Sequence, residues 1–310
     1  MKTKVLIIKL GYSETFDKEI SRASSLGDVL RSTVILHLFK NDDVAWLTDE
    51  KAVPLLYNNP YISRILTYDF TTAFQVQSEM FDVVINLEKV AGICAMSDNI
   101  KAWKRFGFRF NPLTGTADHY MFAEKAMEIV TNDRRKQTLV RTWQASLYDL
   151  FGARWKGEEY ILGYQPSTEE QYDIGFNCHV GTKWPTKAWK MENWKELEQL
   201  CKGEGLSVSW QEGLDNMYSY IDWINKCRCV VSNDSLGLHV AIALKKKTVG
   251  LFGATNEKEV HFYSLGAPVT PNEKFHCRPC SGPKCSFSTE CINTISPEHV
   301  MACIRSMITS

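Results

Sequence analysis

The feature that most constrains this chain is a strand-to-helix transition in its second half, at residues 230–244. An apolar run reaches the polar pair Asp234 and Ser235, and apolar residues then recur at positions 236, 240, 243 and 244. Asp234 or Ser235 is suited to cap the predicted helix, and His239 lies four residues after Ser235 on the helix's first face. Free backbone N–H groups and the positive end of the helix dipole attract phosphate. The sequence therefore predicts either a phosphate site or, more simply, a capped helix with an ordinary surface histidine.

A second strand, residues 248–253, follows this helix and ends in the loop Ala254-Thr255-Asn256. We expect it to lie beside the strand that precedes Asp234, so that both loops open on one edge of the sheet. Open α/β sheets bind ligands at that edge. Thr255 is therefore a further candidate for the phosphate site.

A comparable loop occurs earlier, where the predicted strand 172–180 runs into residues 181–189, before a predicted helix at 191–202. Thr182 and Lys187 in this loop suit a pyrophosphate, because threonine donates hydrogen bonds and lysine carries a compact charge. The chain has no GxGxxG or Walker pattern here, which argues against dehydrogenases and NTPases. Glu212, after the short predicted strand 206–210, is placed to accept hydrogen bonds from a ribose.

In the first half, a buried strand is predicted at residues 4–10, and after a polar stretch the segment Ser25 to Thr33 begins a helical stripe. Asp28 falls near the start of that helix. It either complements the helix dipole, which is common, or acts as a base toward a sugar hydroxyl.

Further strands are predicted at residues 44–48, 62–67 and 81–88, and helices at 119–130 and 136–151. The basic and aromatic segment 101–110 is interpreted as a solvated loop, with an anionic or sugar acceptor surface as the alternative. Glycines punctuate residues 152–164, so we place one domain at 1–155 and a second at 156–310.

Four cysteines near the C-terminus, Cys277, Cys280, Cys285 and Cys291, have the spacing C-x2-C-x4-C-x5-C. In a reducing compartment this predicts a structural tetrathiolate site for zinc or iron. Free thiols or a pair of disulfides are the alternative.

The 310 residues carry 36 basic and 36 acidic side chains, a balance that does not favour nucleic acid as a partner. No apolar run has transmembrane length and no signal-peptide pattern is found, so we expect a cytoplasmic protein.

Several of these motifs resemble glycosyltransferase family 9, the heptosyltransferases of lipopolysaccharide core synthesis and relatives that glycosylate proteins. The shared pattern is Asp-Ser, a histidine five residues after the Asp, Ala-x-Ala-Leu, and a strand ending Leu-Phe-Gly-Ala-Thr. Ser25-Leu-Gly-Asp-Val-Leu30 and Lys187-Ala-Trp189 are similar to two further family motifs. One departure is that Leu236 stands where the family has glycine, and Gly237 follows one position later.

The resemblance implies an α/β fold of GT-B type, two Rossmann-like domains with a ligand cleft between them. The N-terminal domain would hold the acceptor, and the C-terminal domain would hold ADP-heptose. Asp28 would be the base of an inverting transfer that requires no metal for catalysis. The donor would contact Thr182, Lys187, Glu212, Asp234, Ser235, Gly237, His239 and Thr255.

The acceptor would be a lipid-linked glycan, another glycan or a protein hydroxyl, and the enzyme could be peripheral to the inner membrane. A catalytically silent glycosyltransferase-like binding or assembly protein is the alternative. A sugar-nucleotide epimerase is disfavoured, because the chain lacks an NAD fingerprint.

Overall fold

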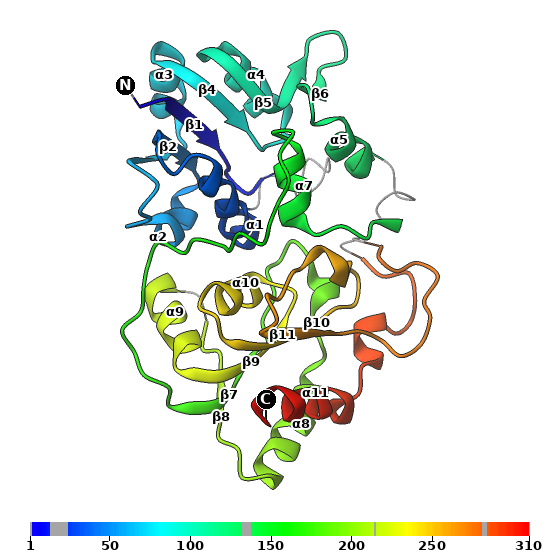
Figure 1. Ribbon diagram of the computed structural model, residues 1–310. Coiled ribbons are helices and arrows are strands. Elements are labelled where there is room, and N and C mark those ends of the chain that lie inside the picture. The colour runs from blue at the N-terminus through cyan, green and yellow to red at the C-terminus, as the bar shows by residue number, and fades with distance from the viewer. Residues whose placement is uncertain (1, 13–23, 132–137, 214, 281–283, 310) are drawn as a thin grey trace. The chain divides into compact units, whose positions relative to one another are not determined.

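The structure is a computed structural model that describes residues 2–12, 24–131, 138–213, 215–280 and 284–309. The chain divides into two compact units (Figure 1): unit 1 is Met1–Arg135 with Trp143–Tyr164, and unit 2 is Lys136–Thr142 with Gln165–Ser310. The sequence analysis placed the boundary at 155/156, whereas the units divide after Tyr164 and residues 136–142 belong to unit 2. Among the described helices, none has the length and apolar character needed to cross a membrane.

Unit 1 contains a six-stranded sheet in the order β3-β2-β1-β4-β5-β6, in which only the β5–β6 pairing is antiparallel. Residues 5–8 of β1 are fully buried, as expected for the central strand of a sheet that is covered on both faces. The strand order reverses between β1 and β4, and open α/β sheets bind ligands at such a switch point. The strands are β1 (Lys4–Ile8), β2 (Asp43–Thr48), β3 (Arg64–Thr67), β4 (Met80–Asn86), β5 (Lys101–Asn111) and β6 (Thr116–His119).

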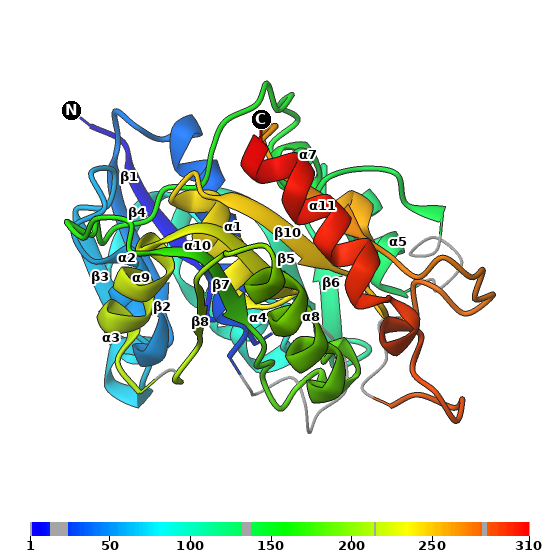
Figure 2. The same ribbon diagram turned by 90° about the horizontal axis from the view of Figure 1, so that it is seen from below.

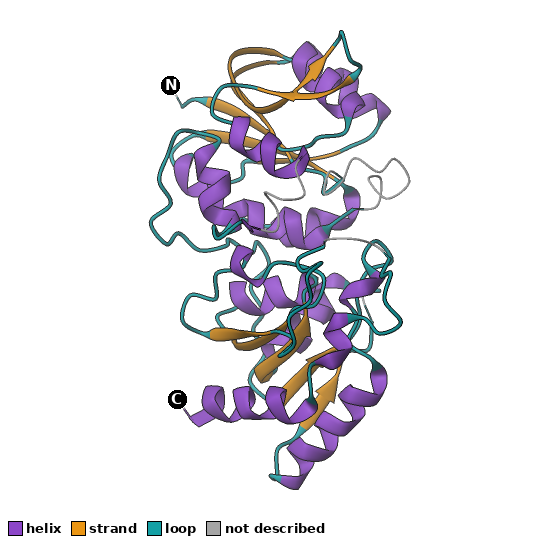
Figure 3. Cartoon of the chain, turned by 90° about the vertical axis from the view of Figure 1, so that its right-hand side faces the viewer, coloured by secondary structure: helices purple, strands orange, loops and turns teal. Residues whose placement is uncertain are grey.

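Helices flank the strands of each unit (Figure 3). In unit 1, Leu6 and Ile8 of β1 pack with Val76 of α3 and Ile93 of α4 in one buried cluster. The helices are α1 (Leu26–Ser32), α2 (Val53–Leu56), α3 (Phe70–Ser78), α4 (Ala91–Asn99), α5 (Glu124–Thr131) and α7 (Trp143–Asp149), with 3-10 turns η1 (Thr33–Leu38) and η2 (Glu50–Ala52).

Two predictions for unit 1 need correction. Residues 101–110 are not a loop, because they belong to β5, where Phe106 and Phe108 are buried and pairing with β4 satisfies the backbone. The helix expected from residue 119 begins only at 124, because residues 116–119 pair with β5 as strand β6. Of the helix expected at 136–151, residues 143–149 are helical as α7, while residues 136 and 137 lie outside the described part.

Unit 2 contains a five-stranded parallel sheet in the order β11-β10-β9-β7-β8. The strand after the Asp234 helix does lie beside the strand before it, as predicted, since β10 pairs with β9. The order reverses between β7 and β9, which puts the switch point at the carboxyl ends of these two strands. The strands are β7 (Tyr172–Asn177), β8 (Val208–Trp210), β9 (Cys227–Asn233), β10 (Lys247–Leu251) and β11 (Gly266–Val269).

One face of the unit 2 sheet is covered by α8 and α11, which lie beside each other (Figure 2). Trp194 and Leu197 of α8 pack there with Val300 and Ile304 of α11. On the other face α10 is buried almost throughout, which fits its uniformly apolar sequence. The helices are α8 (Met191–Gly203), α9 (Met217–Asn225), α10 (Leu236–Ala243) and α11 (Pro297–Thr309), with 3-10 turns η3 (Pro185–Lys187), η4 (Glu257–Glu259) and η5 (Cys291–Thr294).

Candidate functional site

The switch point of unit 2 brings together most of the residues predicted to bind phosphate. Ser235 is the N-cap of α10, and Asp234 just before it is 7% exposed. The Lys187 ammonium, from the loop between β7 and α8, lies 3.0 Å from one Asp234 carboxylate oxygen. His239 Nε2 lies 3.9 Å from the other. A loop and a helix start therefore converge on one carboxylate.

Asp234 is ionised at neutral pH. Burial opposes its ionisation, because the charged form loses contact with water. The positive charges of Lys187 and His239, with smaller contributions from Thr255 and from the Lys187 hydrogen bond, outweigh burial and lower the pKa of Asp234 to about 2. Asp234 thus holds Lys187, His239 and Thr255 in one cluster beside the α10 N-terminus.

A buried amide fixes the start of α10. Asn177, at the end of β7, donates hydrogen bonds to the hydroxyls of Ser232 at 2.7 Å and Ser235 at 2.9 Å. It accepts one from the Tyr220 hydroxyl at 2.6 Å. A Cβ added to Gly237 would lie 2.3 Å from the Tyr220 hydroxyl and 2.4 Å from the Asn177 amide. This close approach therefore requires a glycine at position 237, which is one position later than in the family's pattern.

The Lys187 loop is tied to the end of β9 by Asn233. The Asn233 side chain accepts a hydrogen bond from the Trp189 backbone N–H at 3.1 Å and donates one to the Cys178 carbonyl at 2.7 Å. Trp189 itself is buried in the unit 2 core. These contacts fix the register of the loop against the sheet, and with it the position of Lys187.

Two predicted donor residues are not part of the Asp234 cluster. Thr182 and Glu212 are exposed. No hydrogen bond or ion pair links either to Asp234 in the portion of the chain that the structure describes. Their contact with a donor stays a prediction.

Sequence reasoning missed Asn177, Tyr220 and Asn233. Each is polar yet buried or nearly so, and two of them end a buried strand. A polar residue at the end of an apolar strand run is the signal that could have identified Asn177 and Asn233. Nothing local marks Tyr220, whose partner is 43 residues away in sequence.

The four cysteines predicted to hold a metal are described, with Cys277 and Cys285 partly exposed, Cys280 exposed and Cys291 buried. Burial raises the pKa of Cys291 to about 11, with smaller contributions from the other three thiols that show they lie near it. Across the described residues, no group of three or more His, Cys, Asp or Glu side chains is arranged to hold a metal ion. The thiols thus lie in one region without forming a ligand set, and metal binding stays a prediction.

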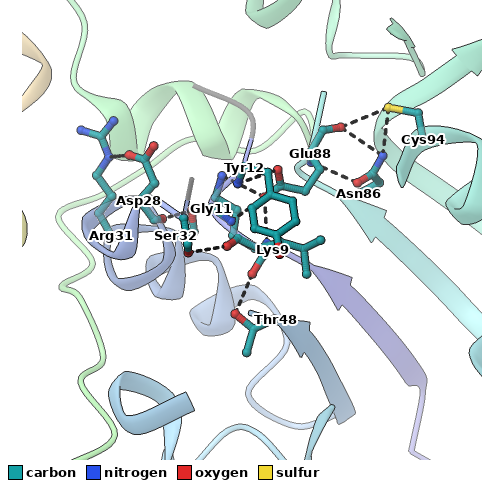
Figure 4. A network of polar contacts seen from close by, with 12 residues as sticks. Lys9, Gly11, Tyr12, Asp28, Arg31, Ser32, Thr48, Asn86, Glu88 and Cys94 are labelled. Carbon is teal, nitrogen blue, oxygen red and sulfur yellow. Dashed lines mark hydrogen bonds and ion pairs between the residues drawn. The ribbon is translucent and has the colours of Figure 1, made fainter. Parts of the chain in front are cut away.

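In unit 1, Asp28 lies in the first turn of α1 and is 5% exposed. Its carboxylate is 2.7 Å from Arg31 Nε, three residues later (Figure 4). The Arg31 guanidinium lies 4.0 Å from the centre of the Trp143 ring. Asp28 therefore has a fixed cationic neighbour. The polar stretch that precedes it, residues 13–23, lies outside the described residues.

Glu88 organises the loop after β1 at the switch point of unit 1. It accepts hydrogen bonds from the backbone N–H groups of Leu10, Gly11 and Tyr12 at 2.8, 2.9 and 3.1 Å. The Lys9 ammonium lies 3.2 Å from the same carboxylate (Figure 4). Glu88 is fully buried, so these charge-assisted bonds hold the chain as it turns at Gly11, whose φ is +83°.

Lys89, the next residue, has an unusual environment. Its ammonium lies 4.6 Å from the centre of the Phe108 ring. Burial and the nearby charge of Lys9 lower the pKa of Lys89 to about 8, although Glu88 and Asp28 oppose the shift. The edge of unit 1 that carries Asp28 therefore also carries a lysine that loses its proton more readily than usual.

Comparison with known proteins finds similar sequences and similar folds. Residues 213–290, which include β9, α10 and β10, match the family model described as glycosyltransferase family 9 (heptosyltransferase). A curated relative, lipopolysaccharide heptosyltransferase 1 of Campylobacter coli, is 21% identical and aligns over 93% of this chain and 98% of its own.

Solved structures share the fold over nearly the whole chain. A family 9 glycosyltransferase from Veillonella parvula superposes with a TM-score of 0.69 at 16% identity, covering 99% of this chain and 97% of that one. The E. coli heptosyltransferase WaaC with ADP-2-deoxy-2-fluoro heptose gives a TM-score of 0.62 at 15% identity, covering 97% and 99%. The solved structures show a two-domain α/β fold of GT-B type, and the matching segment and the curated relative are similar to glycosyltransferase family 9.

Proposed function

We propose that this glycosyltransferase moves a heptose from ADP-heptose to a hydroxyl of a lipopolysaccharide core acceptor, with inversion at the anomeric carbon. The observation that carries the proposal is the cluster of Lys187, Asp234, His239 and Thr255 at the N-terminus of α10. WaaC was solved with ADP-2-deoxy-2-fluoro heptose, and the C. coli relative is a lipopolysaccharide heptosyltransferase. The first supports this donor, and the second supports this class of acceptor.

The α10 cluster is suited to a leaving diphosphate. Its negative charge grows as the bond to the anomeric carbon breaks. The backbone N–H groups at the start of α10 and the Lys187 ammonium are fixed before the reaction, so they stabilise that charge without rearrangement. Asp234 supports this role by holding Lys187 and His239 in place rather than by touching the donor's anionic groups.

Asp28 is the proposed base. It takes the proton of the acceptor hydroxyl while the hydroxyl oxygen bonds to the anomeric carbon and the diphosphate leaves from the opposite side. A single displacement of this kind inverts the configuration. Arg31 Nε lies 2.7 Å from the Asp28 carboxylate and holds it in place.

Two variants test the proposal separately. Lys187→Ala should weaken ADP-heptose binding by about tenfold, the effect of removing one charge-assisted contact. Asp28→Asn should leave the Kd for ADP-heptose within about twofold of the wild-type value. It should abolish both heptose transfer and the slow hydrolysis of the donor. Calorimetry gives the binding constants and release of ADP gives the turnover.

UDP- and GDP-sugars serve as donor controls, and Lys258→Ala serves as a charge control, because Lys258 is exposed in the loop after β10. If no nucleotide sugar binds, or if Lys258→Ala weakens binding as much as Lys187→Ala, the donor site is wrongly assigned. Full turnover by Asp28→Asn would exclude Asp28 as the base.

We also propose that Cys277, Cys280, Cys285 and Cys291 bind one structural zinc or iron ion. A second proposal is that the protein acts in the cytoplasm. All ten cysteines are free thiols in the structure, as a reducing compartment would keep them. Elemental analysis of protein purified without chelator should find about one ion per chain, lost in a Cys277→Ser, Cys285→Ser variant. If the purified wild-type protein contains no metal, the proposed metal site is wrong.

A further inference from the structure

Two described pieces of the cysteine-rich region, residues 277–280 and 290–295, contact both loops that carry the proposed diphosphate ligands. We call these two pieces the brace. Neither piece takes part in the proposed chemical step. Their contacts with the Thr255 loop and with the Lys187 loop are made by different residues, so the two observations are independent.

Arg278 contacts the Thr255 loop at both of its ends. Its Nε donates a hydrogen bond to the Gly253 carbonyl at 2.7 Å, just before the loop. Its terminal nitrogen lies 3.2 Å from the Glu257 carboxylate, just after the loop. The same nitrogen is 3.5 Å from the Phe252 carbonyl. The planar guanidinium thus bridges the residues that flank Thr255, which a single ammonium could not do.

Residues 290–295 support the Lys187 loop. The Asn293 side chain accepts a hydrogen bond from the Lys190 backbone N–H at 2.8 Å, and the Ile295 carbonyl accepts one from the Trp189 indole at 3.1 Å. The brace also packs against the Thr255 loop here, because a Cβ added to Gly253 would lie 2.4 Å from Cβ of Ile292. One segment therefore holds both loops against the sheet.

We propose that Arg278 and Asn293 are positioning residues for the donor diphosphate: they set the places of Thr255 and Lys187 without touching the donor. The inference rests on the proposed function, because it takes Thr255 and Lys187 as ligands of the diphosphate. Arg278 is the main contributor, since its side chain is only 16% exposed and its bonds are charge-assisted. The brace thus makes donor affinity depend on the cysteine-rich region.

The test compares ADP with adenosine, because only ADP carries the diphosphate. Arg278→Ala should raise the Kd for ADP about tenfold and change that for adenosine less than twofold, measured by NMR titration of the full chain. Asn293→Ala should have a smaller effect of the same kind. Arg278→Lys should recover part of the loss, because lysine keeps the charge but reaches fewer of the acceptors.

Arg305→Ala is the matched control. Arg305 also pairs with a glutamate of unit 2, Glu204, but at the exposed ends of α11 and α8. The ADP affinity of this variant should equal that of the wild type. If Arg278→Ala does not fold, Glu257→Gln removes the negative charge that pairs with the guanidinium and should give the same selective loss at smaller size.

Four outcomes would overturn the inference. Unchanged ADP binding by Arg278→Ala, or equal losses for ADP and adenosine, refutes the positioning role while the donor site stands. An equal loss in Arg305→Ala would show a general charge effect. Wild-type protein that binds no ADP would instead refute the proposed function, and the inference with it.

Discussion

Asp234 is the residue whose charge organises the donor cluster, and its stability contribution has a defined pH window. The pKa of Asp234 is about 2 in the folded state, against an ordinary value of 3.8. A carboxyl group with a lowered pKa stabilises the folded state above its unfolded value and loses that contribution as pH falls. The contribution should therefore be complete above about pH 4 and disappear toward pH 2.

We predict that Asp234→Asn lowers the free energy of unfolding by about 1–2 kcal/mol at pH 7, since each pKa unit corresponds to about 1.4 kcal/mol. Thermal denaturation from pH 7 to pH 2 should show the wild type and the variant converging below pH 4. Asp215→Asn, at an exposed site in the same unit, should match the wild type at every pH. A difference that persists at pH 2 would mean that the amide disturbs packing rather than charge.

The charge of Lys89 destabilises the folded state, whereas that of Asp234 stabilises it. The folded-state pKa of Lys89, about 8, lies below the ordinary 10.5. The unfolded chain holds a proton that the folded chain gives up between these values, so stability should rise as pH increases from 8 to 10.5. We predict that Lys89→Met stabilises the protein by about 1–2 kcal/mol below pH 8 and that the gain disappears above about pH 10.

The matched control is Lys104→Met. The Lys104 ammonium also lies near an aromatic ring, 4.7 Å from the centre of Phe106, but Lys104 is exposed. Its replacement should change the unfolding free energy by less than about 0.5 kcal/mol. Chemical denaturation at several pH values compares the two variants. An equal gain in both would show that added hydrophobicity, and not the removal of a poorly solvated charge, explains the Lys89 result.

Among the elements, α10 depends on close packing at its first turn. Alanine is normally about 1 kcal/mol better than glycine inside a helix. At Gly237, however, a Cβ would press on the Tyr220 hydroxyl and the Asn177 amide, at 2.3 and 2.4 Å. The steric cost should therefore exceed the gain in helix propensity.

We predict that Gly237→Ala destabilises the protein by about 1–3 kcal/mol, a typical cost of overpacking a buried site. It should also weaken ADP binding, because Asn177 orients Ser235. Gly203→Ala, at the end of α8 with nothing within 4 Å of the new Cβ, should be neutral or stabilising. Chemical denaturation compares the two, and a Gly237→Ala variant as stable as Gly203→Ala would contradict the packing argument.

At the scale of the whole molecule, both units are doubly wound sheets whose strand order reverses once, between β1 and β4 and between β7 and β9. In each unit the reversal coincides with a polar hub, Glu88 in unit 1 and Asn177 in unit 2. Loops diverge to opposite sides at such a point. Glu88 accepts hydrogen bonds there from backbone N–H groups, and Asn177 bonds to the hydroxyls of Ser232 and Ser235.

Binding of ADP should change the stability and the hydrogen exchange of the intact chain. We predict that ADP at one hundred times its Kd stabilises the folded state by about 2.7 kcal/mol. Hydrogen exchange should slow at residues 233–239 and 186–190, the start of α10 and the Lys187 loop. Protection confined to other regions, with these segments unchanged, would place the nucleotide elsewhere.

Much of the molecule follows from local patterns in the sequence. The apolar runs of β1, β7, β9 and β10 and the helix α8 were predicted at nearly their observed positions. The resemblance to family 9 predicted that Lys187, Asp234 and His239 contact one donor, and the structure places their side chains next to one another. The strands and helices depend on residue spacing and on general rules of α/β folds.

Contacts between residues distant in sequence were decided only by the tertiary structure. The polar, aromatic segment 101–110 is a strand because β4 and β6 pair with it. Asn177, Tyr220 and Ser235 meet although up to 58 residues separate them, and Arg278 reaches Gly253 across 25. Periodicity reports which face of an element is buried, but not which side chain of another element it will meet, because that depends on how the elements pack.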